Sequence, residues 1–414
     1  MHPFTVLFVA LTVAGLALRE WLLWRQASAV RHSRDQVPAP FAGAITPEQH
    51  ARAADYTWAL ARASMAQAVA SAAILLALTV GGGIEAIDAL IADLGFGPIA
   101  HGVAVVATVA LLLVACGLPF DLWSTFGIEA RFGFNRTTAA LFAVDVVKGL
   151  VISAVLLVPL VAALLWSMPL LGGTWWLWAW CGWALFSLLL GWAWPRLIAP
   201  LFNRFHELED GELRSAVEAL ARRCGFEPRS VRVMDGSRRS SHGNAYFTGL
   251  GRAKRIVFFD TLLQSLAPPE VQAVLAHELG HFRLRHVAWR IVWSLAAALG
   301  GFATLAWLAG EPWFQPALGV TAGGTHTLLL LFVLVAPAFL LPLQPLRAWL
   351  SRRHEFQADA YAAQHADAAA LADALVKLYR DNATTLTPDR LYTAFHASHP
   401  PALDRIARLR GAPA

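Results

Sequence analysis

Two histidines four residues apart, with a glutamate directly after the first, are the residues of this chain best suited to chemistry. They form the run His277-Glu278-Leu279-Gly280-His281. At positions i and i+4 of a helix, two imidazoles project from one face and can bind the same metal ion, typically zinc. The glutamate beside them can then deprotonate a water molecule that the metal activates. The spacing therefore predicts a metallopeptidase with His277 and His281 as ligands and Glu278 as general base.

The residues before this run predict the helix that must hold it. Pro268 and Pro269 suit a first helical turn, and apolar residues recur every three or four positions after them. Both histidines then fall in the middle of a helix. The alternative, a pair of ordinary surface histidines, is less favoured once the rest of the chain is considered.

A catalytic zinc site usually has three protein ligands and leaves its fourth position to water. A third ligand must therefore come from elsewhere in the chain. Glu355 and Asp359 are four residues apart in an alanine-rich helical context. A ligand carboxylate, followed one turn later by a carboxylate that accepts a hydrogen bond from a ligand histidine, would complete the site. The alternative is a solvated acidic face that balances Arg352 and Arg353.

The composition places these residues in a membrane protein. Of the 414 residues, 57% are hydrophobic and 15% are charged, and the mean hydropathy is +0.51. Apolar stretches of about 18 or more residues can cross a bilayer. Seven such stretches lie near residues 3–23, 64–82, 101–120, 139–166, 175–194, 287–309 and 327–346. The first lacks the basic segment and cleavage site of a secretory signal, so we expect it to be a retained span.

The charges between the spans predict their orientation. Basic residues gather after the first span, at Arg19, Arg25, Arg31, Arg34, Arg52 and Arg62. The next connection has Glu85, Asp88 and Asp93 and no Lys or Arg. Because basic loops face the cytoplasm, we expect an external N-terminus and, after seven crossings, a cytoplasmic C-terminus. Topology and contact with the lipid bilayer explain the net charge of +5, and nothing indicates binding of nucleic acid.

Residues 195–286 form the first polar segment long enough to fold outside the bilayer. Residues 212–224 predict a helix, and residues 231–234, 244–247 and 256–259 predict three short strands before the zinc helix. An unpaired strand edge can hold an extended peptide by backbone hydrogen bonds. Our candidate edge is the segment Gly243-Asn244-Ala245-Tyr246-Phe247. The alternative is that all three are ordinary strands of a small sheet.

Two pairs of charged residues in or near the spans lead to predictions about their surroundings. Asp145 and Lys148 lie within the fourth span, where a charge facing lipid would cost several kcal/mol. We therefore expect these two side chains to face one another, other protein groups or water. Glu129 and Arg131 lie in a loop, where a solvated pair is the default expectation.

Further motifs accompany the zinc helix and the segment Glu355-Phe-Gln-Ala-Asp359. They are Glu129-Ala-Arg-Phe-Gly-Phe-Asn135-Arg-Thr-Thr138, Ile198-Ala-Pro-Leu-Phe-Asn203, Ser240-Ser-His-Gly-Asn-Ala-Tyr-Phe247 and Ser398-His399-Pro400-Pro401. In this order, interleaved with seven spans, they resemble the integral-membrane zinc endoproteases of the Ste24 type, also called CAAX prenyl protease 1, in peptidase family M48. The likeness covers nearly the whole chain.

The resemblance implies a set of roles for the candidate site residues. It implies that His277, His281 and Glu355 bind one Zn²⁺ per chain and that Glu278 is the general base. Asp359 would orient a ligand histidine, and His399 would stabilise the oxyanion near the metal. The edge strand that binds the substrate backbone would comprise Gly243, Asn244, Ala245, Tyr246 and Phe247.

The fold that the resemblance implies is mainly α. It is a polytopic membrane protein with seven transmembrane helices around a water-filled chamber and a gluzincin-like α+β zinc-protease domain on the cytoplasmic side. Residues 1–194 would hold five spans and residues 195–286 the first part of the protease domain. Residues 287–346 would hold spans six and seven, and residues 347–414 the second part of the domain with the third ligand. The loop with Glu129 would then pack against the protease domain.

The expected substrate is a membrane-associated polypeptide, and the resemblance implies a C-terminal CAAX sequence that can carry a prenyl group. The large excess of Arg over Lys is typical of a bacterial, inner-membrane protein, and most bacteria do not prenylate proteins. General quality-control proteolysis without a prenyl requirement is therefore an alternative. A non-catalytic transporter or scaffold is a further alternative, disfavoured because the zinc motif lies outside the spans and because the ligands and base are all present. The oligomeric state stays open.

Overall fold

The computed structural model describes residues 1–227, 230–248 and 255–411. Within them, seven helical segments are long and apolar enough to cross a membrane, which confirms the predicted polytopic fold. The main helix of each span is, in chain order, α1 (Pro3–His32), α2 (Pro47–Leu78), α4 (Pro98–Leu122), α5 (Ala139–Leu170), α6 (Trp175–Ala193), α11 (His286–Ala309) and α13 (Thr325–Leu340).

The helices that span the membrane run past the apolar stretches that predicted them. α2 begins at Pro47, well before residue 64, because Thr46 and Gln49 form a reciprocal capping box there. It ends at Leu78, earlier than predicted, and Gly82 then adopts a φ of +75°. Hydropathy marks the part of a helix inside the bilayer, whereas caps and turns set the ends of the helix itself.

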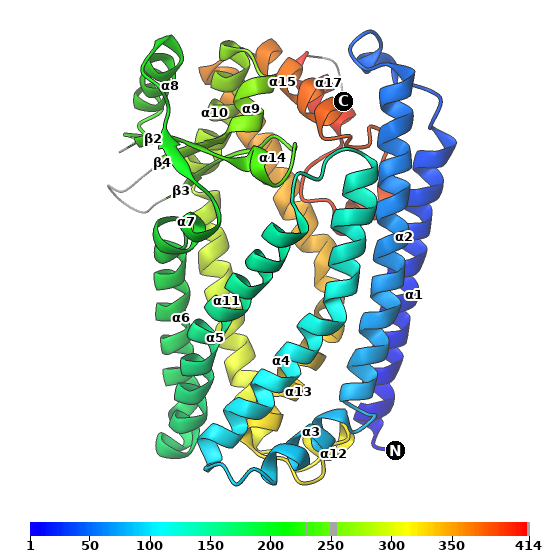
Figure 1. Cartoon of the computed structure of the whole chain (residues 1–414), viewed down its shortest axis with the longest axis vertical. Helices are drawn as coiled ribbons and strands as arrows, with labels where there is room; N and C mark the ends of the chain where they lie inside the picture. Colours follow the sequence, from blue (N-terminus) through cyan, green and yellow to red (C-terminus); the bar gives the residue numbers. More distant parts are fainter. Residues whose placement is uncertain (228–229, 249–254, 412–414) are drawn as a thin grey trace.

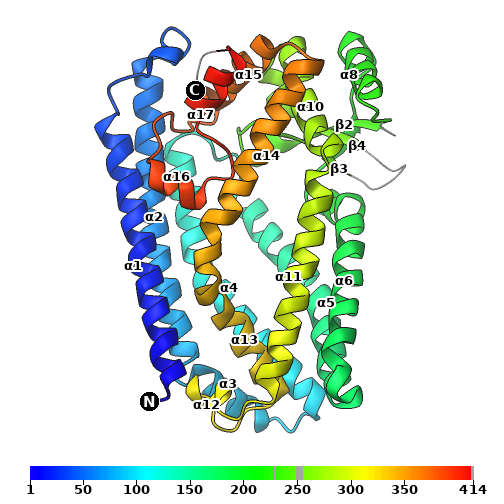
Figure 2. The same ribbon diagram turned by 180° about the vertical axis from the view of Figure 1, so that it is seen from behind.

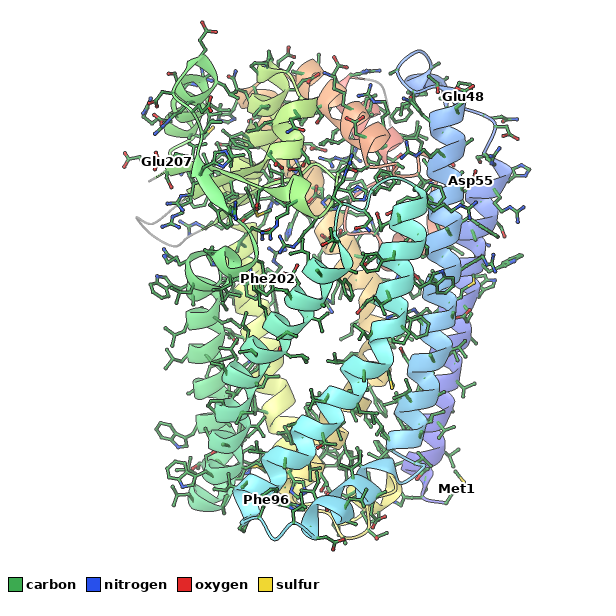
Figure 3. All side chains as sticks on the ribbon, in the orientation of Figure 1. Met1, Glu48, Asp55, Phe96, Phe202 and Glu207 are labelled. Carbon is green, nitrogen blue, oxygen red and sulfur yellow. The ribbon has the colours of Figure 1, made fainter. Side chains whose placement is uncertain are left out.

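The spanning helices form an open arrangement between two differently built ends (Figures 1 and 2). α1 and α2 lie side by side at one flank, α6 and α11 lie at the other, and α4 and α5 slant between them. The N-terminus lies at the lower end of Figure 1 and the C-terminus at the upper end. Met1 and Phe96 lie at the lower end, whereas Glu48, Asp55 and Glu207 lie at the upper end (Figure 3).

The spans pack most extensively at the lower end, and α1 and α2 also pack together above it. Only 6% of the most apolar window of Ala139–Leu170 is buried, and the highest value, for Thr325–His365, is 28%. A hydrophobic cluster joins the spans at the lower end to α3 (Gly83–Ala92) and α12 (Phe314–Ala317). Its buried members include Phe8, Ile84, Val105, Phe314 and Leu331. The spans are therefore joined at this end, whereas above it α1 and α2 remain together as a pair.

The seventh span passes into the upper end without an intervening loop. α13 is followed by the short 3₁₀ segment Leu341–Leu343 and then directly by α14 (Gln344–His365). Glu355 and Asp359 lie on the buried face of α14. The expected boundary at residues 346 and 347 therefore falls inside an almost continuous helical rod.

A four-stranded sheet lies at the upper end. Its strands are β1 (Phe205–Glu207), β2 (Ser230–Met234), β3 (Ala245–Thr248) and β4 (Arg255–Phe259), in the order β1-β2-β4-β3. β2 and β4 are parallel, and the other two pairs are antiparallel. The three predicted strands are present within about one residue, and β3 is at the edge as expected. β1 was not predicted, because three residues are too few to show an alternating pattern.

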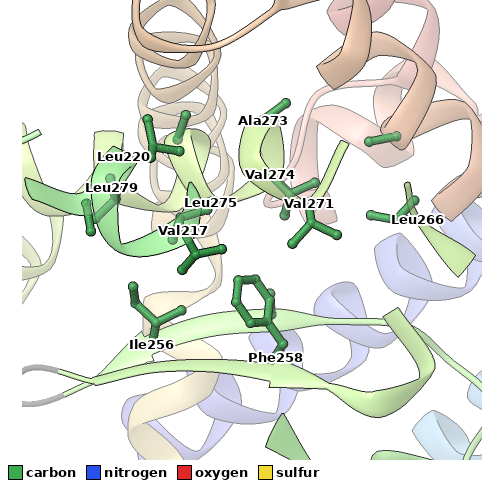
Figure 4. Packing of buried hydrophobic residues seen from close by; sticks show 14 of the residues in the cluster. Val217, Leu220, Ile256, Phe258, Leu266, Val271, Ala273, Val274, Leu275 and Leu279 are labelled. Carbon is green, nitrogen blue, oxygen red and sulfur yellow. The ribbon is translucent and has the colours of Figure 1, made fainter. Parts of the chain in front are cut away.

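The core of the upper end packs three helices with this sheet. These are α8 (Glu212–Arg223), α10 (Pro268–Arg283) and α15 (Ala368–Asp381). Figure 4 shows the contact, with Val217 and Leu220 from α8, Ile256 and Phe258 from β4, and Val271, Val274, Leu275 and Leu279 from α10. Each fully buried Leu or Phe contributes about 1.5–3 kcal/mol. This burial fixes the apolar face of α10 and so directs its histidines to another side.

The charged residues of the fourth span do not face one another. The carboxylate of Asp145 instead accepts two hydrogen bonds from Arg239, at 2.8 and 3.0 Å. Lys148 donates to the carbonyl of Leu201 at 2.7 Å. Glu129, at the end of the third span, accepts a hydrogen bond from Tyr56 and lies 3.5 Å from His242 Nε2. Both acidic groups therefore tie the spans to residues just before β3, so the default expectation of a solvated Glu129 is wrong.

Candidate metal centre

A close crossing of α10 and α14 brings the predicted ligands together. A Cβ atom at Gly280 would lie 3.1 Å from Ala358 Cα and 3.2 Å from the Ala358 carbonyl oxygen. Any side chain at position 280 would therefore push the two helices apart. The glycine between the zinc-motif histidines, which the sequence alone left without a role, sets the distance from which Glu355 reaches His277 and His281.

The ligating side chains of His277, His281 and Glu355 converge on one point, and we call this set the upper triad. His277 Nε2 and His281 Nε2 are 3.3 Å apart. Glu355 approaches them through Oε2, 3.4 Å from His277 Nε2, and Oε1, 3.3 Å from His281 Nε2. Tetrahedral zinc with bonds of about 2.0–2.1 Å would separate its ligands by about 3.3–3.4 Å. The side chains of His277 and Glu355 are buried, and Glu355 Oε2 has no hydrogen-bond partner. This donor set therefore fits a metal ion.

The carboxylate of Asp359, behind the upper triad, makes the site favourable for positive charge. Asp359 Oδ1 lies 2.8 Å from His277 Nδ1. Burial lowers the pKa of His277, but the neighbouring carboxylates of Asp359 and Glu355 outweigh it and raise that pKa to about 9. With Asp359 accepting the Nδ1 proton, Nε2 is directed at the other two ligands.

Arg405 neutralises part of this buried negative charge. It lies on α17 (Ala402–Leu409) and donates to both oxygens of Asp359, from Nε at 2.8 Å and from Nη2 at 2.6 Å. Its Nη1 is 3.7 Å from Glu355 Oε2. The arginine and Asp359 are both buried, so neither charge would be tolerated without the other.

His286 contacts the Nδ1 atom of His281, as Asp359 contacts the Nδ1 atom of His277. Its Nδ1 lies 3.0 Å from His281 Nδ1, and its Nε2 lies 3.0 Å from the side-chain oxygen of Gln357. An amide oxygen only accepts, so Nε2 of His286 must carry the proton and Nδ1 must be an acceptor. His281 then donates from Nδ1, and its Nε2 lone pair is free for a metal. His354 stacks on His286, with ring centroids 4.0 Å apart.

Glu278 lies on α10 directly after the first triad histidine. Burial raises the pKa of its carboxyl, although the nearby charges of His277 and His281 oppose that shift. A carboxyl group with a raised pKa near a metal site is a suitable proton acceptor and donor close to neutral pH.

His399 follows α16 (Arg390–His396) and approaches the triad from the C-terminal part of the chain. Its Nε2 is 3.6 Å from Glu355 Oε1, and the side chain is well exposed. The hydroxyl of Ser398 lies 2.9 Å from His399 Nδ1. When that hydroxyl donates, Nε2 of His399 carries the proton and can act as a donor beside the triad.

The residues predicted to bind substrate lie on and just before the edge strand β3, which packs beside α10. Ala245, Tyr246 and Phe247 pair with β4 on one side only. Asn244 precedes them with an exposed side chain. The backbone N–H of Gly243 is already donated to the Asn382 side chain at 3.1 Å, and that of Ala245 to the Asn244 side chain at 2.8 Å. A peptide that uses the N–H of Ala245 would therefore have to displace the Asn244 side chain from it.

Four residues of the centre escaped the sequence analysis, namely Gly280, His286, Gln357 and Arg405. Gln357 and Gly280 lie inside quoted motifs, yet only the helix crossing gives them a role. His286 follows the zinc helix, where Arg285 has a φ of +59° and α11 begins immediately. Nothing in the spacing of Arg405 links it to residues 359 and 277. Its approach depends on the tertiary fold.

Two family descriptions together match most of the chain. "CAAX prenyl protease N-terminal, five membrane helices" matches residues 26–204, and "Peptidase family M48" matches residues 207–412. The two matches meet where the fifth span gives way to β1.

Relatives and one solved structure extend these matches. The chain is 37% identical to "CAAX prenyl protease 1 homolog" of Arabidopsis thaliana, over 78% of this chain and 77% of that one. It is 34% identical to the protein of the same name in Homo sapiens, over 76% and 75% of the two chains. The crystal structure of S. mikatae Ste24p superposes with a TM-score of 0.91 at 28% identity and covers 99% of both chains.

Proposed function

The chain belongs to peptidase family M48 and is an integral-membrane metalloendopeptidase, and from this premise we propose that it uses Zn²⁺ to cleave membrane-associated polypeptides that end in a CAAX sequence. The observation that carries the proposal is the convergence of His277, His281 and Glu355. Their nitrogen–nitrogen and nitrogen–oxygen distances of 3.3–3.4 Å match those between the ligands of tetrahedral zinc, and Glu278 follows His277 on the same helix.

The three triad residues would hold one zinc ion. When bound, such an ion polarises a carbonyl and makes a water molecule more acidic. Asp359 and His286 each hold the far nitrogen of one ligand histidine, so that both Nε2 atoms stay turned to the ion. Arg405 keeps Asp359 in place.

Glu278 would be the general base and later the general acid. It takes the proton from the attacking water and returns it to the departing amine, a use for which its raised pKa is suited. His399 would donate from Nε2 to the developing oxyanion, and Ser398 would fix the ring state that permits this.

The open edge of β3 would bind the substrate backbone. A peptide lying along Asn244, Ala245, Tyr246 and Phe247 would add a fifth strand to the sheet and pass beside α10. We assign Gly243 to positioning this strand, since Asn382 holds its backbone from behind.

The membrane setting supports two further proposals. The sparse burial of the spans supports a chamber between them that opens to the centre from below. The basic residues near the upper ends of α1 and α2, against the acidic α3 at the lower end, support a cytoplasmic centre and an external N-terminus. The excess of Arg over Lys supports a bacterial inner membrane. The expected division at residues 194, 286 and 346 stays a proposal.

Paired peptides test the substrate. We would present one CAAX peptide in farnesylated and unmodified form to detergent-purified protein, with Glu278→Gln as blank. Faster cleavage of the farnesylated form supports processing of prenylated chains. Equal cleavage, together with cleavage of an unrelated unfolded membrane-associated polypeptide, favours the second candidate, general quality control. The proposed chamber between the spans could admit substrates of either kind. If none of these polypeptides is cleaved, both candidate functions are contradicted.

A further inference from the structure

A second set of metal-ligating side chains lies at the lower end of the molecule. It consists of Asp88 on α3, His101 on α4 and His326 on α13, which we call the lower triad. One ligating atom of each lies within 4.8 Å of the other two. α3 and α10 lie at opposite ends of the molecule in both views (Figures 1 and 2), so this set is separate from the upper triad.

The two imidazoles of the lower triad converge on one carboxylate oxygen. His101 Nε2 is 2.7 Å from Asp88 Oδ1, and His326 Nε2 is 2.6 Å from the same atom. The two rings are nearly perpendicular, with centroids 5.1 Å apart. All three side chains are largely buried, with exposed fractions of 12–17%.

Two glycines make the room that His326 occupies. A Cβ atom at Gly102, next to His101 on α4, would lie 2.9 Å from His326 Cβ and 2.8 Å from Leu165 Cδ1. A Cβ atom at Gly324 would lie 3.0 Å from His326 Cε1. Real Cβ atoms essentially never come as close as the one at position 102 would, so the start of α13 can approach α4 there because that residue is glycine. The contact at position 324 is merely tight, and the His326 ring would have to shift slightly to accept a side chain there. The backbone is therefore shaped to place this imidazole.

Two imidazole nitrogens and one carboxylate oxygen suit zinc and related divalent transition metals, whereas calcium and magnesium prefer oxygen alone. Bound to one another, both rings must carry their proton on Nε2. Metal binding would move those protons to Nδ1 and widen each nitrogen–oxygen distance by about 0.7 Å, to the edge of a zinc tetrahedron. Rotation of the side chains supplies this change. We propose that the lower triad binds a divalent transition-metal ion, independently of the peptidase centre.

Such an ion would fix the point where the spans converge. Asp88 comes from the short helix between the second and third spans, and the histidines come from the first turns of the third and seventh. Ile84 of α3 belongs to the hydrophobic cluster there, and Glu85 accepts a hydrogen bond from the Thr321 backbone N–H at 3.1 Å. The ion would thus join three chain segments that the cluster already brings together.

Counting bound zinc in full-length, detergent-purified protein tests the proposal. The protein is stripped with a chelator, dialysed against buffered Zn²⁺ and analysed by elemental mass spectrometry. We expect two equivalents in the parent and in His206→Ala, a control at an exposed histidine outside both triads. We expect one in His326→Ala, one in His281→Ala, and none in the double variant. His326→Ala should hydrolyse peptide at the parent rate, which also shows that it folds.

The His281→Ala background separates this proposal from the proposed peptidase function. Its remaining equivalent should be weakened by Asp88→Asn, which keeps the size of the side chain and removes its charge. No zinc in His281→Ala would overturn the proposal and leave the lower triad as a hydrogen-bonded clamp. An equivalent that persists in His281→Ala/His326→Ala would also overturn it, because the ion would then lie elsewhere.

Discussion

The upper and lower triads use the same side chains, two histidines and one carboxylate, yet their surroundings differ. In the upper triad the ligating atoms stand 3.3–3.4 Å apart, and Asp359 and His286 hold the far nitrogens of the histidines. In the lower triad the atoms touch at 2.6 and 2.7 Å, and the support comes from glycines that make room. Partners behind the ligands hold the upper ligating atoms apart, whereas the lower ligands hydrogen-bond directly to one another.

The triads also differ in what lies beside them. Glu278 adjoins the upper triad with a raised pKa, and His399 approaches from a separate segment. Beside the lower triad, the neighbouring carboxylate on α3, Glu85, bonds to Thr321 instead. Ligand type therefore indicates metal binding in both places, but within the described part of the chain an acid–base group that could use the metal adjoins the upper triad alone.

Removing a ligand from each triad should give the largest contrast. His281→Ala should reduce peptide hydrolysis to the blank rate, because two remaining ligands cannot hold a catalytic ion. His326→Ala should leave hydrolysis unchanged, since the lower triad lies at the other end of the molecule. Initial rates on one peptide measure both. Equal losses in the two variants would mean that the triads are not functionally separate.

Removing the buried arginine should give the largest loss of stability. Arg405→Ala leaves Asp359 buried without its partner, which should lower the free energy of unfolding by about 3–5 kcal/mol. Arg410→Ala is a matched control from the next turn of the chain, because its pair with Asp373 is exposed and should contribute only about 0–1 kcal/mol. Denaturant unfolding in detergent measures both. Similar shifts would show that the buried pair does not support the centre.

The histidine behind the upper triad should have a moderate effect. His286→Ala removes the acceptor of the His281 Nδ1 proton, and loss of such a partner should weaken zinc binding by about 10–100-fold. His354→Ala, which removes only the ring stacked on His286, should weaken it less. Competition with a chromogenic chelator gives both affinities. A larger effect for His354→Ala would contradict the proposed role of His286.

Adding a single methyl group at a packed glycine should produce the smallest effect. The property that it changes should differ between the upper and lower ends. Gly280→Ala crowds Ala358 and should destabilise the upper end by about 1–3 kcal/mol, with weaker binding of the upper zinc. Gly102→Ala crowds His326 and should weaken only the lower zinc. Gly300→Ala, at a helical glycine with open space around it, is the control. Zinc titrations of the three variants distinguish these outcomes, and equal effects on both metals would contradict local packing as the cause.

The sequence predicted those parts of the fold that repeat a simple pattern. Apolar runs predicted all seven spans, alternation predicted three strands, and proline and periodicity predicted α10 from Pro268. Helix ends were predicted less well, as for α2, where a capping box at Thr46 acts outside the apolar run. The pairing of Asp145 with Arg239 could not be predicted, because the two residues are far apart in sequence.

The candidate site shows the same division. Helical spacing alone predicted His277, His281 and Glu278. Glu355 was predicted because a zinc site needs a third ligand, and His399 was predicted from the family resemblance. Gly280, His286 and Arg405 depend on how α10, α11 and α17 meet around α14. Of the lower triad, the sequence singled out Asp88 alone, as one of the acidic residues in the connection after the second span. Its histidines come from helices remote in sequence, so only the fold brings them to that carboxylate.

Zinc content and peptide hydrolysis of the parent and of Glu278→Gln, measured on the same samples, test the central claim most directly. Glutamine keeps the shape of the side chain and cannot accept the proton, so hydrolysis should fall by about 10²–10⁴-fold. The zinc content should stay equal to that of the parent, because Glu278 holds no metal. A variant that keeps near-parent activity would contradict the role of Glu278, and a parent that binds no zinc at the upper triad would contradict the zinc peptidase itself.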